Sequence, residues 1–122
     1  MQFRIQSICY DRWNASQLVI DLTNEGVPME PFGQGFQSMS APTKELEKLI
    51  LGEQIIHDGN PVMSWMLSNI ALQEDPAGNI KPNKAKSTEK IDGVVALIMA
   101  LGSYMTEGYI NSVYDGRGLL IL

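Results

Sequence analysis

The spacing of apolar residues divides the start of the chain into a strand, a helix and a second strand. Phe3–Tyr10 (FRIQSICY) alternates and then becomes apolar, which predicts a strand that is half buried at first and fully buried at its end. Asn14–Glu25 predicts an amphipathic helix closed by Gly26. Val27–Phe32 contains two prolines and predicts a short edge strand. Together these segments predict a βαβ unit. The apolar stripe of the helix consists of Ala15, Leu18, Val19 and Leu22.

The middle of the chain carries the patterns of two more helices. After a loop at Gly33–Met39, a helix is expected to open at Ser40 with Pro42 in its first turn and to end at Gly52. The next helix is expected to begin after Asn60, which is a good N-cap followed by proline, and to run to about residue 71. Its predicted buried face consists of Val62, Met63, Met66, Leu67 and Ile70.

A turn-rich segment and a group of lysines follow. Leu72–Asn83 predicts a β-hairpin, because the turn sequence Asp75–Asn79 lies between two short extended arms. The densest basic cluster of the sequence comes next and consists of Lys81, Lys84, Lys86 and Lys90. Two interpretations are open for this cluster: a solvated loop that balances nearby acids, or a contact to phosphate or carboxylate groups of a ligand.

Ser87–Leu101 (STEKIDGVVALIMAL) predicts a buried helix, because its residues are apolar on nearly every side. Ser87 is the expected N-cap, and Gly102 lies where a C-terminal glycine is favoured. The helix carries one acid near its start, Asp92. A carboxylate beside buried apolar residues must be paired, protonated or bound to a metal. The alternative is an acid that is placed in the first turn because the helix dipole favours it there.

Two other residues are candidates for chemistry. Asp11 follows the first predicted strand directly, at the carboxyl end where open α/β sheets bind their ligands. Alternatively, Asp11 starts the turn or caps the next helix, although Asn14 is the better placed N-cap. His57 is the one histidine of the sequence, and a lone histidine is more often structural than a metal ligand.

Composition and charge narrow the class of protein. The 122 residues suffice for one domain with a modest core. No apolar run approaches the ~20 residues that cross a membrane, and the first residues do not form a signal peptide. Together with the single cysteine, Cys9, these features predict a cytoplasmic protein without membrane contact. The net charge of −5 argues against an autonomous nucleic-acid binder, but not against an enzyme that meets phosphates through carboxylate-bound metals.

Four segments carry a resemblance to a known family. They are YDRWNA at Tyr10–Ala15, HDGNPVMSWMLSN at His57–Asn69, KPNKAKSTEKIDGVVALIMAL at Lys81–Leu101 and SVYDGRGLL at Ser112–Leu120. In combination they resemble the nuclease domain of the large terminase subunit of tailed bacteriophages, and the resemblance covers nearly the whole chain. The P-loop of that family's ATPase motor is absent from the sequence.

The resemblance implies an α/β, RNase H-like fold and an endonuclease that cuts double-stranded concatemeric DNA during packaging. It implies two divalent metal ions, Mg²⁺ or Mn²⁺, held by acids from a first strand, the end of a fourth strand and a late helix. Asp11 matches the second of these positions and Asp92 the third, so both are expected to be catalytic metal ligands. Lys84 and Lys86 are expected to contact the DNA backbone. In the full-length family, the small terminase subunit and the portal are the implied partners, inside the bacterial host cell.

The resemblance also implies that the first-strand acid and the motor precede the matched region. Residues 1–102 are therefore expected to form a truncated RNase H-like domain that lacks the first strands, and residues 103–122 a C-terminal tail. Phe3–Tyr10 would then expose a strand edge, and we expect a homodimer or swapped assembly through this edge or the tail. Whether the chain is itself an enzyme stays open. The alternatives are a folded non-catalytic prophage remnant and a small interaction module in which Asp11 and Asp92 are capping residues.

Overall fold

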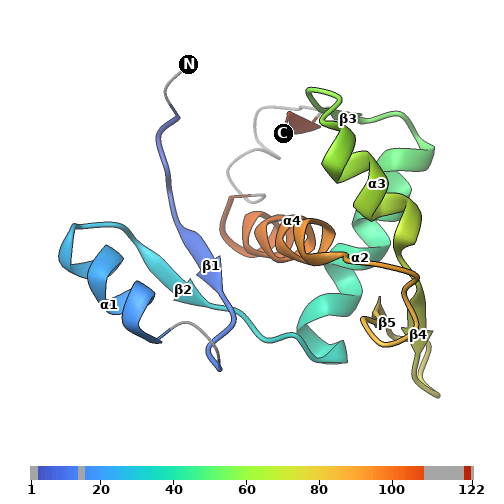
Figure 1. Cartoon of the computed structure of the whole chain (residues 1–122), viewed down its shortest axis with the longest axis horizontal. Coiled ribbons are helices and arrows are strands. Elements are labelled where there is room, and N and C mark those ends of the chain that lie inside the picture. Colours follow the sequence, from blue (N-terminus) through green and yellow to red (C-terminus); the bar gives the residue numbers. More distant parts are fainter. Residues whose placement is uncertain (1–2, 14–15, 109–119, 122) are drawn as a thin grey trace.

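The computed structural model describes residues 3–13, 16–108 and 120–121, which form a small mixed α/β structure (Figure 1). Three pairs of short strands are distributed among four α-helices. The element order is β1 (Ile8–Tyr10), α1 (Ser16–Asn24), β2 (Met29–Pro31), α2 (Phe36–Leu51), β3 (Ile55–Ile56), α3 (Pro61–Asn69), β4 (Leu72–Glu74), β5 (Ile80–Pro82), α4 (Asp92–Ser103), a π-helical turn (Tyr104–Gly108) and β6 (Leu120–Ile121). None of the described helices combines the length and the apolar character that a membrane span requires.

The predicted βαβ unit is confirmed, with β1 and β2 parallel and Cys9 opposite Glu30. The strand is shorter than predicted, because residues 3–7 are extended but do not pair with another described strand. The prediction of a fully buried strand end is wrong, since β1 is only half-buried throughout. The stripe predicted for α1 is confirmed in part: Val19 and Leu22 are half-buried, but no described residue of the helix is fully buried and Leu18 is 60% exposed. A two-stranded sheet is too small to cover the whole stripe. The expected N-cap, Asn14, lies outside the described residues.

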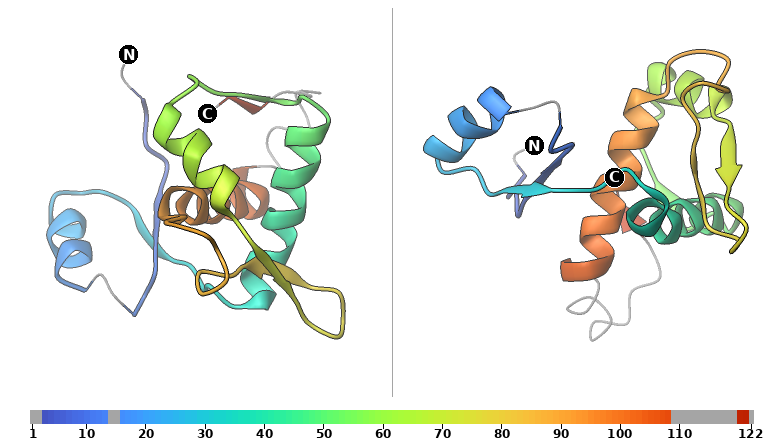
Figure 2. Two further views of the ribbon diagram at one scale, coloured as in Figure 1. Left: turned by 45° about the vertical axis from the view of Figure 1, so that its right-hand side comes forward. Right: turned by 90° about the horizontal axis from the view of Figure 1, so that it is seen from below.

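The core lies around α4, as its apolar sequence predicted. The buried apolar side chains come mainly from α4 and α2 and comprise Met39, Leu46, Leu49, Ile91, Val94, Val95, Ile98, Met99 and Leu101. Figure 2 shows α4 between the βαβ unit on one side and α2 and α3 on the other. Two glycines allow this close packing: a Cβ atom on Gly93 would lie 2.5 Å from Cε of Met66, and one on Gly102 would lie 2.5 Å from Cζ of Phe32. α4 therefore fixes the position of every neighbouring element relative to the others.

The start of α2 differs from the prediction. The helix begins at Phe36 with Gly35 as N-cap, so Ser40 and Pro42 lie inside it and do not open it. Ser40 does not cap the helix, because its hydroxyl accepts a hydrogen bond from the backbone N–H of Ile80 in β5 (3.1 Å). The predicted end of the helix is confirmed, with Gly52 as the C-cap.

The start of α3 and the hairpin are as predicted. Asn60 caps α3, and its Oδ1 accepts from the backbone N–H groups of Val62 and Met63 (2.9 and 3.2 Å). Only part of the predicted face is covered: Met63 and Met66 pack against the core, whereas Val62 is exposed. β4 and β5 form the antiparallel hairpin, with Gln73 opposite Lys81. β6 pairs in parallel with β3, so that residues 120–121 lie beside the connection between α2 and α3.

Candidate functional site

Asp92 is the first residue of α4, which begins later than the sequence predicted. Ser87 is not the N-cap, and no side chain caps the helix. The expectation of a carboxylate beside buried residues is wrong, because the side chain of Asp92 is 72% exposed. The alternative, an acid in the first turn of the helix, is confirmed. It lies on the solvent side of α4, on which Ala96 and Ala100 are also exposed. The carboxylate is therefore an accessible acid at the positive end of a helix dipole.

The structure brings Asp92 together with one of the predicted lysines. Nζ of Lys84 lies 3.6 Å from Oδ1 of Asp92, and the lysine side chain is 56% exposed. An ion pair this exposed contributes only about 0–1 kcal/mol to the free energy of unfolding, so its effect on stability is small. What the pair does provide is an ammonium group and a carboxylate, both reachable by an incoming ligand.

The basic segment before α4 is held in place by Asn83. The Oδ1 atom of Asn83 accepts from the backbone N–H groups of Ala85 and Lys86 (3.0 and 3.1 Å). The backbone oxygen of Asn83 accepts from the hydroxyl of Ser87 (2.7 Å), and this hydroxyl accepts in turn from the N–H of Ala71 (3.1 Å). These bonds tie the segment to the end of α3. The interpretation as a solvated loop that balances nearby acids is confirmed for Lys84, which is exposed and pairs with Asp92, and the segment is in addition an ordered turn.

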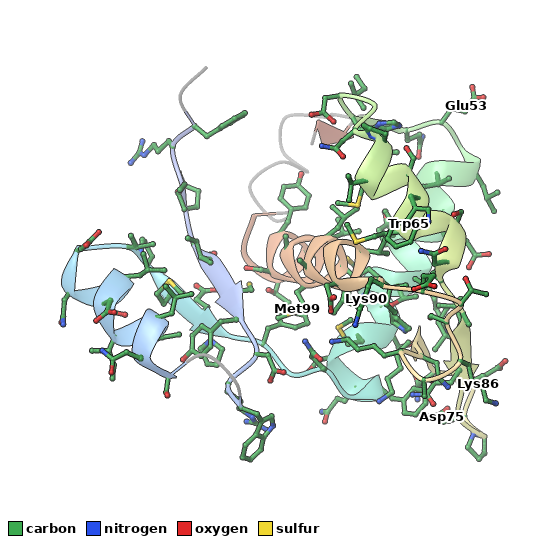
Figure 3. All side chains as sticks on the ribbon, in the orientation of Figure 1. Glu53, Trp65, Asp75, Lys86, Lys90 and Met99 are labelled. Atoms are coloured by element: carbon green, nitrogen blue, oxygen red, sulfur yellow. The ribbon has the colours of Figure 1, made fainter. Side chains whose placement is uncertain are left out.

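A buried asparagine anchors the rest of the segment. The Nδ2 group of Asn69 donates to the backbone oxygen of Lys90 (3.2 Å), and its Oδ1 accepts from the hydroxyl of Thr88 (3.3 Å). Sequence reasoning missed both Asn69 and Asn83, although an asparagine at the end of an apolar helix is a signal that a polar partner is needed. In Figure 3, Lys90 lies beside α4, whereas Lys86 lies near the hairpin. Lys86 forms no ion pair with a described residue.

Asp11 directly follows β1. Its Oδ1 accepts from the backbone N–H of Trp13 (3.2 Å), so it has the structural role in the turn that was the alternative interpretation of this residue. β1 lies against α4, because Cys9 packs on the core cluster. At the other end of α4, the hydroxyl of Ser103 donates to Oε2 of Glu30 on β2 (3.3 Å). Asp11 and Asp92 are thus carried by two elements that pack directly on each other.

His57 has a local role in the part of the chain that the structure describes. Its Nδ1 accepts from the backbone N–H of Gly59 (3.0 Å) in the turn before α3. The histidine borders an apolar cavity of about 290 Å³, which is also lined by Leu46, Met63 and Leu97. This hydrogen bond gives the residue a structural function.

Comparison with known proteins decides the family. The family model of the terminase large subunit, endonuclease domain, matches residues 1–107. The chain belongs to this family. The resemblance on which the sequence prediction was based is therefore confirmed.

Individual relatives agree with this assignment. The large terminase subunit of Enterobacteria phage HK97 is 37% identical over 103 residues, which are 83% of this chain and 20% of that protein. Protein YmfN of Escherichia coli K12 is 40% identical over 97 residues, 78% of this chain and 21% of YmfN. The crystal structure of the HK97 large terminase matches 83% of this chain and 22% of that chain, with a TM-score of 0.75 and 37% identity. The chain thus spans about a fifth of the length of these relatives.

The described residues do not contain the full set of metal ligands that the family resemblance implies. The family's nuclease activity was expected to need several carboxylates around divalent metal ions. The described residues contain no group of three or more His, Cys, Asp or Glu side chains suited to hold a metal ion. Asp11 and Asp92 therefore do not form part of a complete metal centre within the described residues.

Proposed function

We propose that this chain contributes part of an RNase H-like nuclease centre in a large terminase subunit, which cuts double-stranded concatemeric DNA during phage DNA packaging. The family match supports the nuclease assignment. The observation that carries the site is the exposed carboxylate of Asp92, at the start of a largely buried helix and paired with Lys84. A carboxylate that is open to solvent at the start of a helix packed in the core is accessible to an external cation.

In this proposal the carboxylate oxygens of Asp11 and Asp92 would hold Mg²⁺ or Mn²⁺, both of which prefer oxygen ligands. When bound, a pair of such ions would supply an activated water and stabilise the leaving oxygen at a phosphate. The fit is partial, because the described residues supply too few carboxylates in one place. The remaining ligands would come from outside the described residues. The described residues alone therefore do not account for hydrolysis.

The lysines have separate roles in the proposal. Lys84 balances the charge of Asp92 while no cation is bound, since its ammonium group lies beside the carboxylate. If Asp92 held a cation, the ammonium group of Lys84 would be available to contact a backbone phosphate. Lys86 stands on the turn organised by Asn83 and is open to the same DNA strand. Both lysines compensate locally for the net charge of −5.

The proposed setting follows from the family. Double-stranded DNA is the proposed substrate, and the small terminase subunit and the portal are the proposed partners of the full-length protein in the bacterial cytoplasm. We also propose self-association, because residues 3–7 form no backbone–backbone hydrogen bond with another described residue and leave a strand edge open. A single monomer mass in size-exclusion chromatography with light scattering, at high protein concentration, would rule out this association.

A second candidate function is a folded, non-catalytic remnant of the same family. The absence of a three-ligand group among the described residues favours this reading for the chain taken alone. It predicts a folded protein that binds terminase partners or DNA without cutting. The alternative of a small interaction module, in which both acids serve only as capping residues, predicts that Asp11 and Asp92 do not share a metal ion.

Calorimetric titration with Mn²⁺ separates these functions. The nuclease proposal predicts binding by the parent chain and its loss in both Asp11→Asn and Asp92→Asn. Asp21→Asn is the matched control, because Asp21 is an exposed acid on α1 whose partner is Gln17. Loss in both site variants but not in the control would show that the two acids serve one site. No binding by the parent, or equal binding by all variants, would refute the shared site and leave the remnant.

A further inference from the structure

The most exposed large apolar side chain in the described part of the molecule is next to Asp11. Trp13 is 80% exposed, although an indole ring gains more from burial than most side chains. The ring lies in the turn that directly follows β1, at the carboxyl end of the parallel strand pair. This is the edge at which open α/β sheets bind ligands. The exposed ring of Trp13 therefore lies at the end of the βαβ unit where a ligand is expected.

The neighbouring side chain holds the ring in place. The guanidinium carbon of Arg12 lies 5.3 Å from the centroid of the Trp13 ring, within the range of a cation–π contact. Asp11 fixes the backbone of the same turn by accepting the N–H of Trp13. The proposed metal ligand, a cation and a flat aromatic surface thus form one short unit of consecutive residues. Arg12 is exposed, so its N–H groups face solvent.

We propose that Arg12 and Trp13 form a nucleic-acid contact, in which the guanidinium binds a backbone phosphate and the indole packs on a deoxyribose or an unstacked base. Arginine matches phosphate geometry through its planar donors, and aromatic rings stack on nucleic-acid groups with little dependence on sequence. A strand held here would pass beside Asp11. The inference rests on the proposed function, because it takes DNA as the ligand. It adds a binding element that needs no metal ion.

Fluorescence titration in EDTA tests the contact. The chain has two tryptophans, so a Trp65→Phe background leaves Trp13 as the sole indole. Its emission should be quenched by a short DNA duplex and by the same duplex with a single-stranded overhang. Quenching by both duplexes indicates packing on a deoxyribose, whereas quenching by the overhang alone indicates stacking on a base. The usual contribution of base–aromatic stacking corresponds to a loss of about 5- to 150-fold in affinity when the aromatic ring is removed.

Variants measured by anisotropy with labelled DNA complete the test. Trp13→Ala should weaken binding by that factor, and Trp13→Phe should restore most of it. The control is Leu18→Ala, which removes another exposed apolar side chain from the same βαβ unit. Equal affinity of Trp13→Ala and the parent, or no DNA binding by the parent, would overturn the proposal. DNA binding through Trp13 without any Mn²⁺ binding would refute only the metal site, so the two proposals fail separately.

Discussion

The contact between Gly102 and Phe32 yields a prediction that can be worked out from the structure. In Gly102→Ala, the new Cβ atom would lie 2.5 Å from Cζ and 2.9 Å from Cε2 of Phe32, and 3.1 Å from Cγ of Pro42. Neither a half-buried aromatic ring nor a proline inside a helix yields easily, so the strain should reach roughly 1–3 kcal/mol. Replacing glycine by alanine inside a helix returns about 1 kcal/mol through helix propensity. The difference between these two values gives an expected net destabilisation of up to about 2 kcal/mol.

Gly93→Ala is the matched control for this prediction. There the new Cβ atom would meet Cε of Met66 at 2.5 Å, which is the far end of a flexible side chain. Met66 can rotate away, so the helix-propensity gain should offset most of the cost, and the variant should stay within about 0.5 kcal/mol of the parent. Urea denaturation of both variants measures the difference. In a chain of this size, Tm should fall by roughly 3–6 °C for each kcal/mol lost from the free energy of unfolding.

A double variant tests the cause. Phe32→Leu removes the ring atoms that the new methyl group meets, so it should destabilise the parent but cost less in the Gly102→Ala background. If Gly102→Ala proves as stable as Gly93→Ala, the argument that Phe32 is rigid is refuted. The outcome bears on the site, because Phe32 follows β2, whose partner strand β1 leads into Asp11. A shift at Gly102 therefore moves the two proposed metal ligands relative to each other.

Three further predictions concern local structure. Glu53 has a positive φ of 53°, so Glu53→Gly should stabilise the protein by up to ~1 kcal/mol in urea denaturation, and a loss of stability would contradict the strain at this turn. Asn60→Ala removes the cap of α3 and should cost about 1 kcal/mol, whereas Asn60→Ser should recover most of it. The side-chain hydrogen bond from Asn79, with backbone bonds from Asn79 and Ala77, holds the pKa of Asp75 below its usual value. Because this pKa is lower in the folded state, the stabilisation is present above the unfolded pKa of about 3.9 and is lost as the pH falls through the folded pKa. The stability of the chain, measured by urea denaturation at a series of acidic pH values, should therefore depend less on pH in Asp75→Asn than in the parent. An unchanged pH dependence would contradict the role of Asp75.

Local signals were predictable from the sequence, and signals that depend on distant partners were not. The cap at Asn60 and the turn at Asp75–Asn79 involve residues within four positions of each other, and both were placed correctly. Ser40 and Ser87 also have the sequence character of helix caps. Their hydroxyl groups instead bond to the backbone of Ile80 and Ala71, respectively. The sequence pattern around each serine contains no trace of these partners, so both helix starts were misplaced.

The candidate site shows the same division. Asp11 and Asp92 were identified as candidates by their positions after a strand and near a helix start, and as metal ligands only through the family resemblance. The exposure of Asp92 was not predicted, because apolar neighbours in sequence lie on the other sides of α4. The hydrogen bonds by which Asn69 and Asn83 order the segment before α4 were missed as well, because an amide side chain has no periodic sequence pattern that reveals its partner. The physical reason is that hydrogen bonds across the fold depend on a register that only packing determines.

The pairing of β6 with β3 bears on how the protein is made. Ile55 lies opposite Leu120 and Ile56 opposite Ile121, so this short ladder joins two segments that are far apart in sequence. Because synthesis proceeds from the amino end, β3 is made long before its partner strand β6 exists. Contacts between distant segments also form slowly, because a long loop must close first. The connection between α2 and α3 therefore remains an open strand edge during translation, and its closure is among the last steps of folding.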